Sequence, residues 1–154
     1  MNEQTITAYL SATNAAAAID FYKSVFDAQE TAARIADGNG VVGHATLSIG
    51  NSTFYIAEQA EDPKLSRHVK SPQSLNGSSV LLNLMVDNVD DVVERAQKAG
   101  AEIVIPPSDQ FYGHRTGRMV DPFGHVWIVA TVIEDVSEQE MLKRAQAFYE
   151  NSDA

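Results

Sequence analysis

The sequence predicts an α+β fold built from two βαβββ modules followed by a C-terminal helix. The first observation behind this prediction is that the chain matches itself at a constant offset of 74 residues. The aligned pairs are Asn14 with Asn88, Gly43 with Gly117, and Gly50 with Gly124. Asparagine and glycine commonly mark the ends of helices and strands, so their repetition indicates a repeated order of elements. The second observation is that each half has one segment with apolar residues at helical spacing among several strand-like segments. Two similar modules predict a pseudo-symmetric fold whose site lies between the halves.

The first module is predicted to contain one helix and four strands. Asn14 is a suitable N-cap because its side chain accepts a backbone hydrogen bond, and Ile19, Tyr22 and Phe26 recur on one helix face. The short turn at Gly50-Asn51 joins the last two strands. The strands are expected at 4–11, 29–36, 41–49 and 52–58, and the helix at 15–26.

The second module repeats this order. Asp90 and Asp91 fall in the first turn of its helix, where carboxylates complement the helix dipole, and Gly100 suits a left-handed C-cap. Pro106-Pro107 is expected to end the second strand, and Asp121-Pro122-Phe123-Gly124 is a typical β-turn sequence. The expected elements are strands at 80–86, 102–105, 118–120 and 125–133, a helix at 89–99 and a loop at 108–117.

Two further segments lie outside the modules. The polar stretch 59–79 contains prolines, a glycine, charges and serines, which predicts a linker or mobile loop. Ser137-x-x-Glu140 is the pattern of a capping box and predicts a final helix, a buttress or a dimer contact. We therefore expect a single domain over 1–154, with module one at 4–58, the linker at 59–79, module two at 80–133 and the C-terminal helix at 137–150.

The composition is that of a globular protein, with 44% hydrophobic and 21% charged residues. A formal net charge of -10 argues against nucleic acid and anionic membrane surfaces as partners. The chain has no cysteine, which excludes disulfides, thiolate metal sites and cysteine catalysis. No signal peptide is recognisable, and no apolar run approaches the roughly 20 residues that span a bilayer. The expected location is the cytoplasm.

Four segments of the sequence resemble the vicinal oxygen chelate superfamily, which includes glyoxalase I, extradiol dioxygenases and bleomycin-resistance proteins. They are Ala18-Ile19-Asp20-Phe21-Tyr22, Val86-Asp87-Asn88-Val89-Asp90, Asp121-Pro122-Phe123-Gly124-His125-x-Trp127 and Asp109-Gln110-Phe111-Tyr112-Gly113-His114-Arg115-x-Gly117. The last of these is most similar to the PhnB-like branch. The resemblance implies that the paired modules form a curved mixed sheet around a cavity. It says little about the reaction, because one fold serves many functions.

The resemblance also bears on metal binding. In metal-dependent members of the family, ligands sit on the first and last strands of each module. Carried over by register, these positions are Thr7, Phe54, Leu81 and Ile128. Metal-dependent members have His, Gln or Glu there, whereas threonine is a poor ligand and the other three side chains cannot ligate a metal ion. The resemblance therefore implies that the usual metal site is absent and that no cofactor is bound.

Strand alternation predicts which side chains line the cavity instead. Those that share a face with the four family positions are Tyr9, Ser52, Ile56, Asn83, Met85, Val126 and Ala130. This apolar and aromatic set with a few hydrogen-bonding groups suits an organic ligand of low charge. The same composition is ordinary core if the sheet closes tightly.

The loop at 111–115 has two interpretations. In the first, Phe111 and Tyr112 cover an apolar ligand, Arg115 binds a carboxylate or phosphate, and His114 is the general base of any reaction. In the second, the aromatics are anchors that pin the loop and Arg115 pairs with Asp109 or Asp121.

The remaining candidates are histidines and one tryptophan. A variant metal site built from His44, Glu58 and His114 is a further alternative, since the first two lie on neighbouring predicted strands. His125 is expected at the surface or in a second layer, and His68 in solvent. Trp127 alternates with the cavity positions and is expected to pack under a helix.

The function that the sequence favours is metal-free binding of an apolar or aromatic small molecule by a homodimer, as in bleomycin-resistance proteins. The expected ligand-binding residues are Tyr9, Phe54, Leu81, Asn83, Met85, Phe111, Tyr112, Arg115 and Ile128. The competing hypothesis is a lyase, isomerase or dioxygenase that uses a shifted divalent metal site or His114 as its acid–base group. A third is a subunit or regulatory partner without a ligand, which predicts a filled cavity and a large exposed apolar patch.

Overall fold

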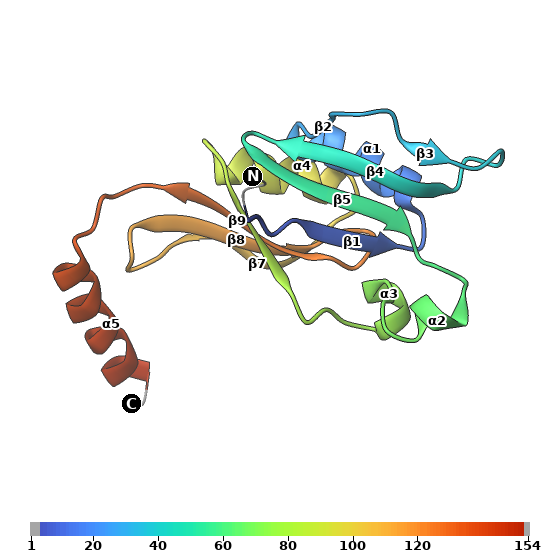
Figure 1. The fold of residues 1–154 in the computed structure, drawn as a ribbon. Coiled ribbons are helices and arrows are strands. Elements are labelled where there is room, and N and C mark those ends of the chain that lie inside the picture. The colour runs from blue at the N-terminus through green and yellow to red at the C-terminus, as the bar shows by residue number, and fades with distance from the viewer. Residues whose placement is uncertain (1–3, 153–154) are drawn as a thin grey trace. The chain divides into compact units, whose positions relative to one another are not determined.

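The computed structural model describes residues 4–152 and has the predicted α+β architecture (Figure 1). Its elements in chain order are β1 (Ala8–Ala12), α1 (Ala15–Phe26), β2 (Gln29–Glu30), β3 (Ile35–Ala36), β4 (Val42–Ile49), β5 (Ser52–Glu58), α2 (Pro63–Ser66), α3 (Pro72–Leu75), β6 (Leu81–Met85), α4 (Val89–Lys98), β7 (Glu102–Asp109), β8 (His114–Val120), β9 (Val126–Val132) and α5 (Glu138–Ser152). The chain divides into two compact units, the first ending at Ser79 and also including Pro122–His125, the second formed by the remainder.

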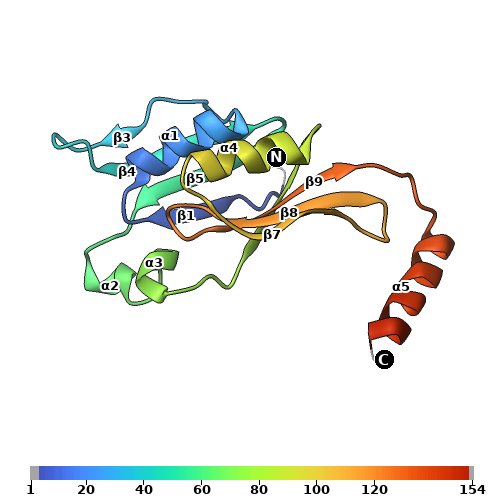
Figure 2. The ribbon, with the colours of Figure 1, turned by 180° about the vertical axis from the view of Figure 1, so that it is seen from behind.

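The first unit is a mixed sheet covered on one face by a helix. Its strands follow the order β1-β5-β4-β2, with β1 parallel to β5 and β3 paired to β4. Helix α1 lies over β4 and β5, as the view from behind shows (Figure 2). The ring of Tyr22 stacks on Phe26 at 5.9 Å and meets Phe54 edge-on at 5.8 Å. This aromatic cluster forms the core between α1 and the sheet.

The second unit repeats this plan with the strand order β6-β9-β8-β7, again with the first strand parallel to the last. Helix α4 packs its buried residues Val89, Val92, Val93 and Ala96 against the sheet. Gly117 permits this packing, because a Cβ there would lie 3.0 Å from the Val93 side chain. Trp127 is buried on the helix-covered face as predicted, and its Nε1 donates to Asp121 Oδ2 at 2.9 Å.

The predicted helix ends are confirmed. Asn14 Oδ1 accepts from Ala17 N at 3.0 Å, and Asn88 Oδ1 accepts from Asp91 N at 3.2 Å. Gly100 has a φ of 101° after α4, and Ser137 Oγ accepts from Glu140 N at the start of α5. Side-chain caps are local interactions, so sequence reasoning finds them reliably.

Three strand predictions were wrong. The segment 29–36 forms two separate two-residue strands, β2 and β3. Strand β7 continues through Pro106-Pro107, because it lies at the edge of its sheet, where a residue without an N–H is tolerated, and its register shifts between Ile105 and Ser108. Strand β8 begins at His114, inside the segment predicted as a loop.

The ungapped internal match also needs correction. In the first unit Ile49 pairs with Ser52 across a two-residue turn, whereas in the second Val120 pairs with Val126 across the five residues 121–125. The offset of 74 holds for the two N-caps and for the bounds of β5 and β9. Because the turn in the second unit is three residues longer, aligning β4 with β8 requires a gap of three residues. Gly43 and Gly117 are therefore not equivalent.

The remaining segments are partly ordered into helices. The stretch 59–79 contains α2 and α3, with Asp62 and Ser71 as side-chain caps. In its own unit, α5 lies beyond the closed end of the β7–β8 hairpin (Figure 1). Among residues 4–152, no helix is both long enough and apolar enough to cross a membrane.

Candidate functional site

The strand register assigns side chains of the first sheet to two faces. Ala8 pairs with Phe54 and Leu10 with Ile56, and the burial of Leu10, Phe54 and Ile56 identifies this as the face toward α1. Tyr9 pairs with Tyr55 and points to the opposite, open face. The prediction that Phe54 and Ile56 share a face with Tyr9 is therefore wrong. The last-strand position beside Tyr9 is Tyr55, because the parallel pairing of β1 and β5 sets a register that the sequence did not reveal.

The open face of the first sheet carries a hydrogen-bonded aromatic group, which we call the Tyr9 cluster (Tyr9, His44, Thr46 and Tyr55). The hydroxyl of Tyr9 lies 2.6 Å from His44 Nδ1, and His44 Nε2 lies 3.2 Å from Thr46 Oγ1. The ring of Tyr55 is 5.4 Å from that of Tyr9 and 5.1 Å from that of His44. The donor and acceptor roles depend on the His44 tautomer: with the ring proton on Nε2, Tyr9 donates to Nδ1 and His44 donates to Thr46.

The Tyr9 phenol remains protonated at neutral pH. Partial burial, together with the nearby Tyr55 phenol, raises the pKa of Tyr9 above its usual value. Its side chain is nevertheless accessible, at 52% exposure. The cluster therefore offers an accessible aromatic surface with a neutral hydroxyl that can orient a polar group of a ligand.

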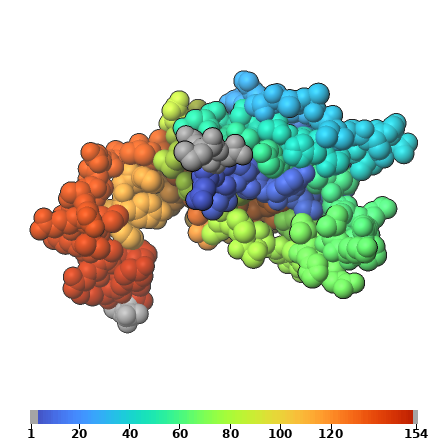
Figure 3. Space-filling model, in the orientation of Figure 1, coloured from blue at the N-terminus to red at the C-terminus, as the bar shows by residue number. Residues whose placement is uncertain are grey.

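A hollow adjoins the Tyr9 cluster. It has a volume of about 420 Å³ and is lined by Tyr9, Leu10, Ser11, Gly43, Ala57, Glu58, Ala60, Leu65 and Val69. Leu65 and Val69 come from the stretch 59–79, whose atoms stand below the blue atoms of β1 in Figure 3. This segment therefore supplies apolar walls, in addition to connecting the two modules.

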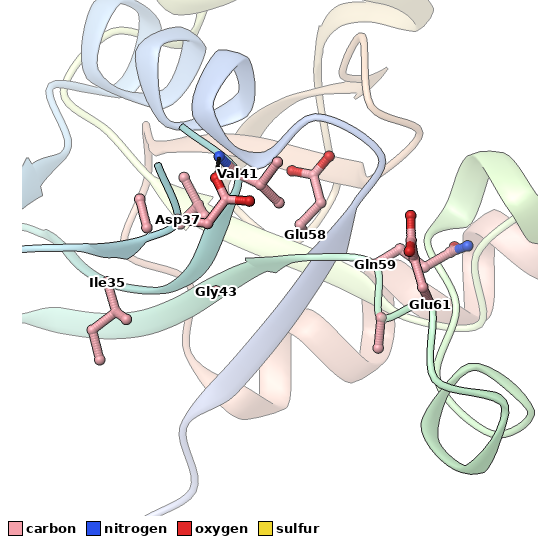
Figure 4. Close-up of a pocket in the computed structure, with 10 residues that line it drawn as sticks. Ile35, Asp37, Val41, Gly43, Glu58, Gln59 and Glu61 are labelled. Carbon is pink, nitrogen blue, oxygen red and sulfur yellow. Dashed lines mark hydrogen bonds between the residues drawn. The ribbon is translucent and has the colours of Figure 1, made fainter. Parts of the chain in front are cut away.

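A second hollow of about 610 Å³ continues from the first and shares Gly43, Glu58 and Ala60 with it. Figure 4 shows Ile35, Asp37 and Val41 on one side of it, with Glu58, Gln59 and Glu61 on the other. Its acidic rim makes it unsuitable for an anion.

The variant metal site considered from the sequence is not assembled in the first unit. Glu58 pairs with Ala12, on the α1 side of the sheet, and its Oε2 accepts from Ala15 N at 2.8 Å at the start of α1. His44 belongs to the open face with Tyr9. No group of three His, Asp or Glu side chains within the described part of the chain is arranged to hold a metal ion.

The open face of the second sheet contains the six residues that strand alternation predicted to share it: Leu81, Asn83, Met85, Val126, Ile128 and Ala130. Each row of paired residues crosses β6, β9 and β8. The rows are Leu81, Val126 and Val120; Asn83, Ile128 and Arg118; and Met85, Ala130 and Thr116. Leu81 and Met85 on β6 are 51% and 45% exposed, whereas Ala130 on β9 is fully buried, so this apolar face is accessible along β6.

Arg118 is the residue of this face that sequence reasoning missed. It lies in the middle row, between two rows of mainly apolar residues. Its Nε is buried and has no hydrogen-bond partner among the described residues. The sequence held only part of the signal, since alternation places Arg118 on the face opposite to Gly117 and Met119. The structure shows that these two residues face α4, which leaves Arg118 on the open face.

Arg115, which was predicted to bind a ligand, is held by carboxylates. Its Nε and Nη2 donate to Asp90 at 2.7 and 2.9 Å, and Nη1 donates to Asp109 at 2.9 Å. Hydrogen bonds to Asp90 and Asp109 raise the pKa of the Arg115 guanidinium. Arg115 thus ties β8 to the first turn of α4, which agrees with the structural interpretation of this residue.

The other loop residues also make structural contacts. Phe111 packs against Phe148 of α5 at 5.3 Å, and its carbonyl accepts from Arg144 Nη1. Tyr112 is 37% exposed and contacts the ring of His114 edge-on. The register places His114, paired with Val132, at the end of the open face, on the same side of β8 as Thr116 and Arg118.

The two remaining histidines differ from each other. His125 is buried, with Nδ1 3.4 Å from the Tyr22 hydroxyl in the first unit, so the prediction of a surface position is wrong and the second-layer alternative fits. His68 is exposed after α2, as predicted.

Comparisons with known proteins agree with this architecture. Residues 6–129 match the family described as Glyoxalase/Bleomycin resistance protein/Dioxygenase superfamily. An uncharacterised protein of Mycobacterium bovis is 34% identical over 139 residues, covering 90% of each chain. TioX from Micromonospora sp. ML1 superposes with a TM-score of 0.63 at 23% identity, covering 87% of this chain and 100% of TioX. The PhnB protein from Bacillus cereus gives 0.61 at 22% identity, covering 83% and 99%. The chain belongs to the glyoxalase/bleomycin-resistance/dioxygenase superfamily, the vicinal oxygen chelate family.

Proposed function

We propose that this protein binds an apolar or aromatic small molecule without a metal ion, as bleomycin-resistance-type members of the superfamily do. The observation that carries the proposal is the composition of the open sheet faces. Each sheet is covered by a helix on one face and presents accessible aromatic or apolar side chains on the other. The metal positions carried over from the family hold no side-chain nitrogen or carboxylate, and neither does Tyr55, which takes the place of Phe54 on the open face.

The first unit offers the better-defined contacts for such a ligand. Tyr9 and Tyr55 provide aromatic edges and faces, and Leu65 and Val69 provide apolar walls of the adjoining hollow. The Tyr9 hydroxyl and the Tyr9–His44 hydrogen bond supply a polar group in a largely apolar surrounding. In the second unit, Leu81, Asn83, Met85 and Ile128 are the proposed contacts.

Two measurements test this proposal. Elemental analysis after incubation with zinc, nickel and manganese and gel filtration is expected to find less than about a tenth of an ion per chain. A screen of aromatic compounds by thermal shift is expected to find stabilising ligands, since a ligand at about 100 times its Kd adds about 2.7 kcal/mol of stability. One retained ion per chain, or a screen without any ligand, would contradict the proposal.

A metal-free enzyme is the second candidate, favoured by one observation. A histidine hydrogen-bonded to an accessible tyrosine at 2.6 Å is a pair suited to moving a proton. In this case the Tyr9 cluster, rather than His114, would supply the acid–base group. The test is exchange of solvent deuterium into small carbonyl compounds, followed by NMR. Exchange that His44→Gln abolishes would support an enzyme, and its absence would leave binding as the function.

Assembly and location complete the proposal. We expect a homodimer in which α5 contributes contacts, because Leu142, Phe148 and Tyr149 of this helix are 61%, 52% and 66% exposed. We expect a cytoplasmic protein that binds neither nucleic acid nor membranes, in keeping with its net charge of -10. Cell fractionation tests the location.

A further inference from the structure

The open face of the second sheet contains a positive charge, that of Arg118, for which the described residues supply no hydrogen-bond acceptor at the buried Nε. Arg34, Arg115 and Arg144 each pair with one or more carboxylates. The Arg118 side chain differs from these three, because its Nε is buried and has no hydrogen-bond partner among the described residues. The chain has 21 Asp and Glu residues against 11 Lys and Arg, so carboxylates are abundant. The buried Nε without an acceptor within residues 4–152 sets this guanidinium apart.

An unpaired buried guanidinium nitrogen is costly to stability. A buried donor without an acceptor loses roughly 1–3 kcal/mol relative to hydration, and more when the group is charged. Such a group in a native protein calls for an explanation, such as strain, a catalytic role, or a water or ion bound to it. A planar guanidinium that still has several free N–H groups matches a carboxylate or phosphate, which it binds with two parallel hydrogen bonds.

The neighbours of Arg118 define the rest of the ligand. Ile128 lies beside it on β9 and Asn83 follows on β6, while Leu81 and Met85 occupy the flanking rows on β6. Strand spacing of about 4.8 Å places the Cα atoms of Asn83 and Arg118 roughly 10 Å apart. An apolar body of that width can lie over Ile128 with its charged group at Arg118 and a polar edge at Asn83.

We infer that Arg118 is an oxyanion-binding residue, and that the ligand of this face is an apolar or aromatic compound carrying a carboxylate or phosphate group. This inference extends the proposed function by naming the charge class of the ligand. It replaces Arg115, whose guanidinium is already occupied by Asp90 and Asp109.

The first test uses the unmodified protein and NMR. A buried Nε–H exchanges slowly with water, so the Arg118 side-chain signal should be visible and assignable by its loss in Arg118→Lys. Benzoate, phenyl phosphate and inorganic phosphate are titrated separately, with benzamide as the neutral counterpart of benzoate. A shift of the Arg118 signal with at least one oxyanion, and none with benzamide, is expected. No shift with any oxyanion would overturn the inference.

The second test compares affinities among variants by calorimetry. Benzoate or phenyl phosphate should bind the wild type about tenfold more tightly than benzamide, because of the charge-assisted hydrogen bonds. Arg118→Gln should remove this preference, Arg118→Lys should retain part of it, and Arg67→Gln, which deletes an exposed arginine, should leave it unchanged. Equal affinity of wild type and Arg118→Gln for benzoate would overturn the inference.

The outcomes separate the two proposals. If benzamide and other neutral aromatics bind but oxyanions have no advantage, the proposed binding function stands and the role of Arg118 is wrong. If inorganic phosphate shifts the Arg118 signal but no aromatic compound binds, the oxyanion site stands and the proposed function is wrong. Preference for benzoate over phenyl phosphate, or the reverse, identifies the anion.

Discussion

At the scale of single residues, neighbouring side chains of β8 have opposite roles. Arg115 faces α4 and joins two carboxylates, whereas Arg118 faces the open side of the sheet and has no described protein partner. Both are arginines within four residues of each other, so composition does not distinguish them. Only the direction of the side chain, set by strand pairing, decides which guanidinium is available to a ligand.

Arg115→Met should therefore reduce stability without affecting ligand binding. The variant loses the links from β8 to Asp90 in α4 and to Asp109 in β7. The midpoint of urea unfolding should fall measurably, while the affinity for benzoate stays that of the wild type. If the variant binds benzoate more weakly and its unfolding midpoint is unchanged, Arg115 contacts the ligand and the structural role proposed here is wrong.

The Tyr9 cluster yields a prediction about protonation geometry. In the wild type the neutral His44 should carry its proton on Nε2, since the Tyr9 hydroxyl, 2.6 Å from Nδ1, can then donate to that nitrogen while Nε2 donates to Thr46. Tyr9→Phe removes the donor to Nδ1 and should give a mixture of tautomers. Long-range ¹H–¹⁵N correlation spectra of the ring nitrogens distinguish these states. The Nδ1–H tautomer in the wild type would contradict this arrangement.

At the scale of elements, hydrogen bonds and an ion pair join the β7–β8 turn, the end of β9 and helix α5. Gly113, at the turn between β7 and β8, accepts hydrogen bonds on its carbonyl from Ile133 N and Glu134 N at 2.9 and 3.0 Å. Arg144 of α5 then pairs with Glu134 at 2.8 Å. The hairpin turn, the end of β9 and α5 therefore depend on one another.

Gly113→Ala should disrupt this junction. The residue has a φ of +86°, and an added Cβ would lie 2.4 Å from the Glu134 carbonyl oxygen. A loss of more than about 2 kcal/mol in the free energy of unfolding is expected, because strain and a steric clash combine. Gly38→Ala is the matched control, since a Cβ there meets nothing within 4 Å. Similar denaturation midpoints for both variants would contradict this account.

The ion pairs of Glu30 in β2 make the free energy of unfolding depend on pH. Glu30 pairs with Lys23 of α1 and with Arg34, whose Nε is 2.7 Å away. The hydrogen bond from Arg34, assisted by Lys23, lowers the pKa of Glu30 to about 2 despite its partial burial. Because the folded-state pKa lies below the usual 4.5, the stabilisation is complete above about pH 4.5 and is lost as the pH falls towards 2.

Glu30→Gln should therefore be less stable than the wild type at pH 7, by roughly 1–3 kcal/mol, and the difference should shrink towards pH 2. Urea unfolding at pH 7, 5 and 3 measures this trend. Glu94→Gln, which alters the exposed pair with Lys98, is the control and should have little effect. A difference that is constant over this pH range would show that Glu30 acts without its charge.

At the scale of the whole molecule, charge and exposed apolar surface point to different partners. A net charge of -10 disfavours anionic surfaces in general, so an oxyanion needs a local positive charge such as Arg118. Met141, Leu142, Phe148 and Tyr149 recur at helical spacing along α5, and none of the described side chains of α5 is fully buried. An accessible apolar helix face of this kind commonly forms an interface.

The pair of substitutions Leu142→Glu and Tyr149→Glu should convert the expected dimer to a monomer, because charges on a contact face oppose its burial. Light scattering after gel filtration measures the mass, and near-ultraviolet circular dichroism checks the fold. Gln139→Glu with Asn151→Glu adds the same charge to α5 and should leave the dimer intact. A wild-type protein that is already monomeric would contradict the assembly proposal.

The sequence alone was sufficient for the features that depend on local interactions. Helices α1 and α4, their asparagine caps, the Asp121–Gly124 turn and the burial of Trp127 all follow from nearby residues or from periodicity. The repeated modules and the family resemblance followed from the same patterns. These predictions needed no knowledge of how strands pair.

Tertiary structure decided which side chains reach the open faces. The pairing of Tyr9 with Tyr55 places Phe54 in the core. The pairing of Ile128 with both Arg118 and Asn83 places an arginine on a face that was predicted to be apolar and aromatic with a few hydrogen-bonding groups. The length of the connection 121–125 and the edge position of β7 also depend on strand pairing in the tertiary structure. The physical reason is that a shift of one residue in strand register moves every side chain to the other face of the sheet, and register depends on contacts between distant segments.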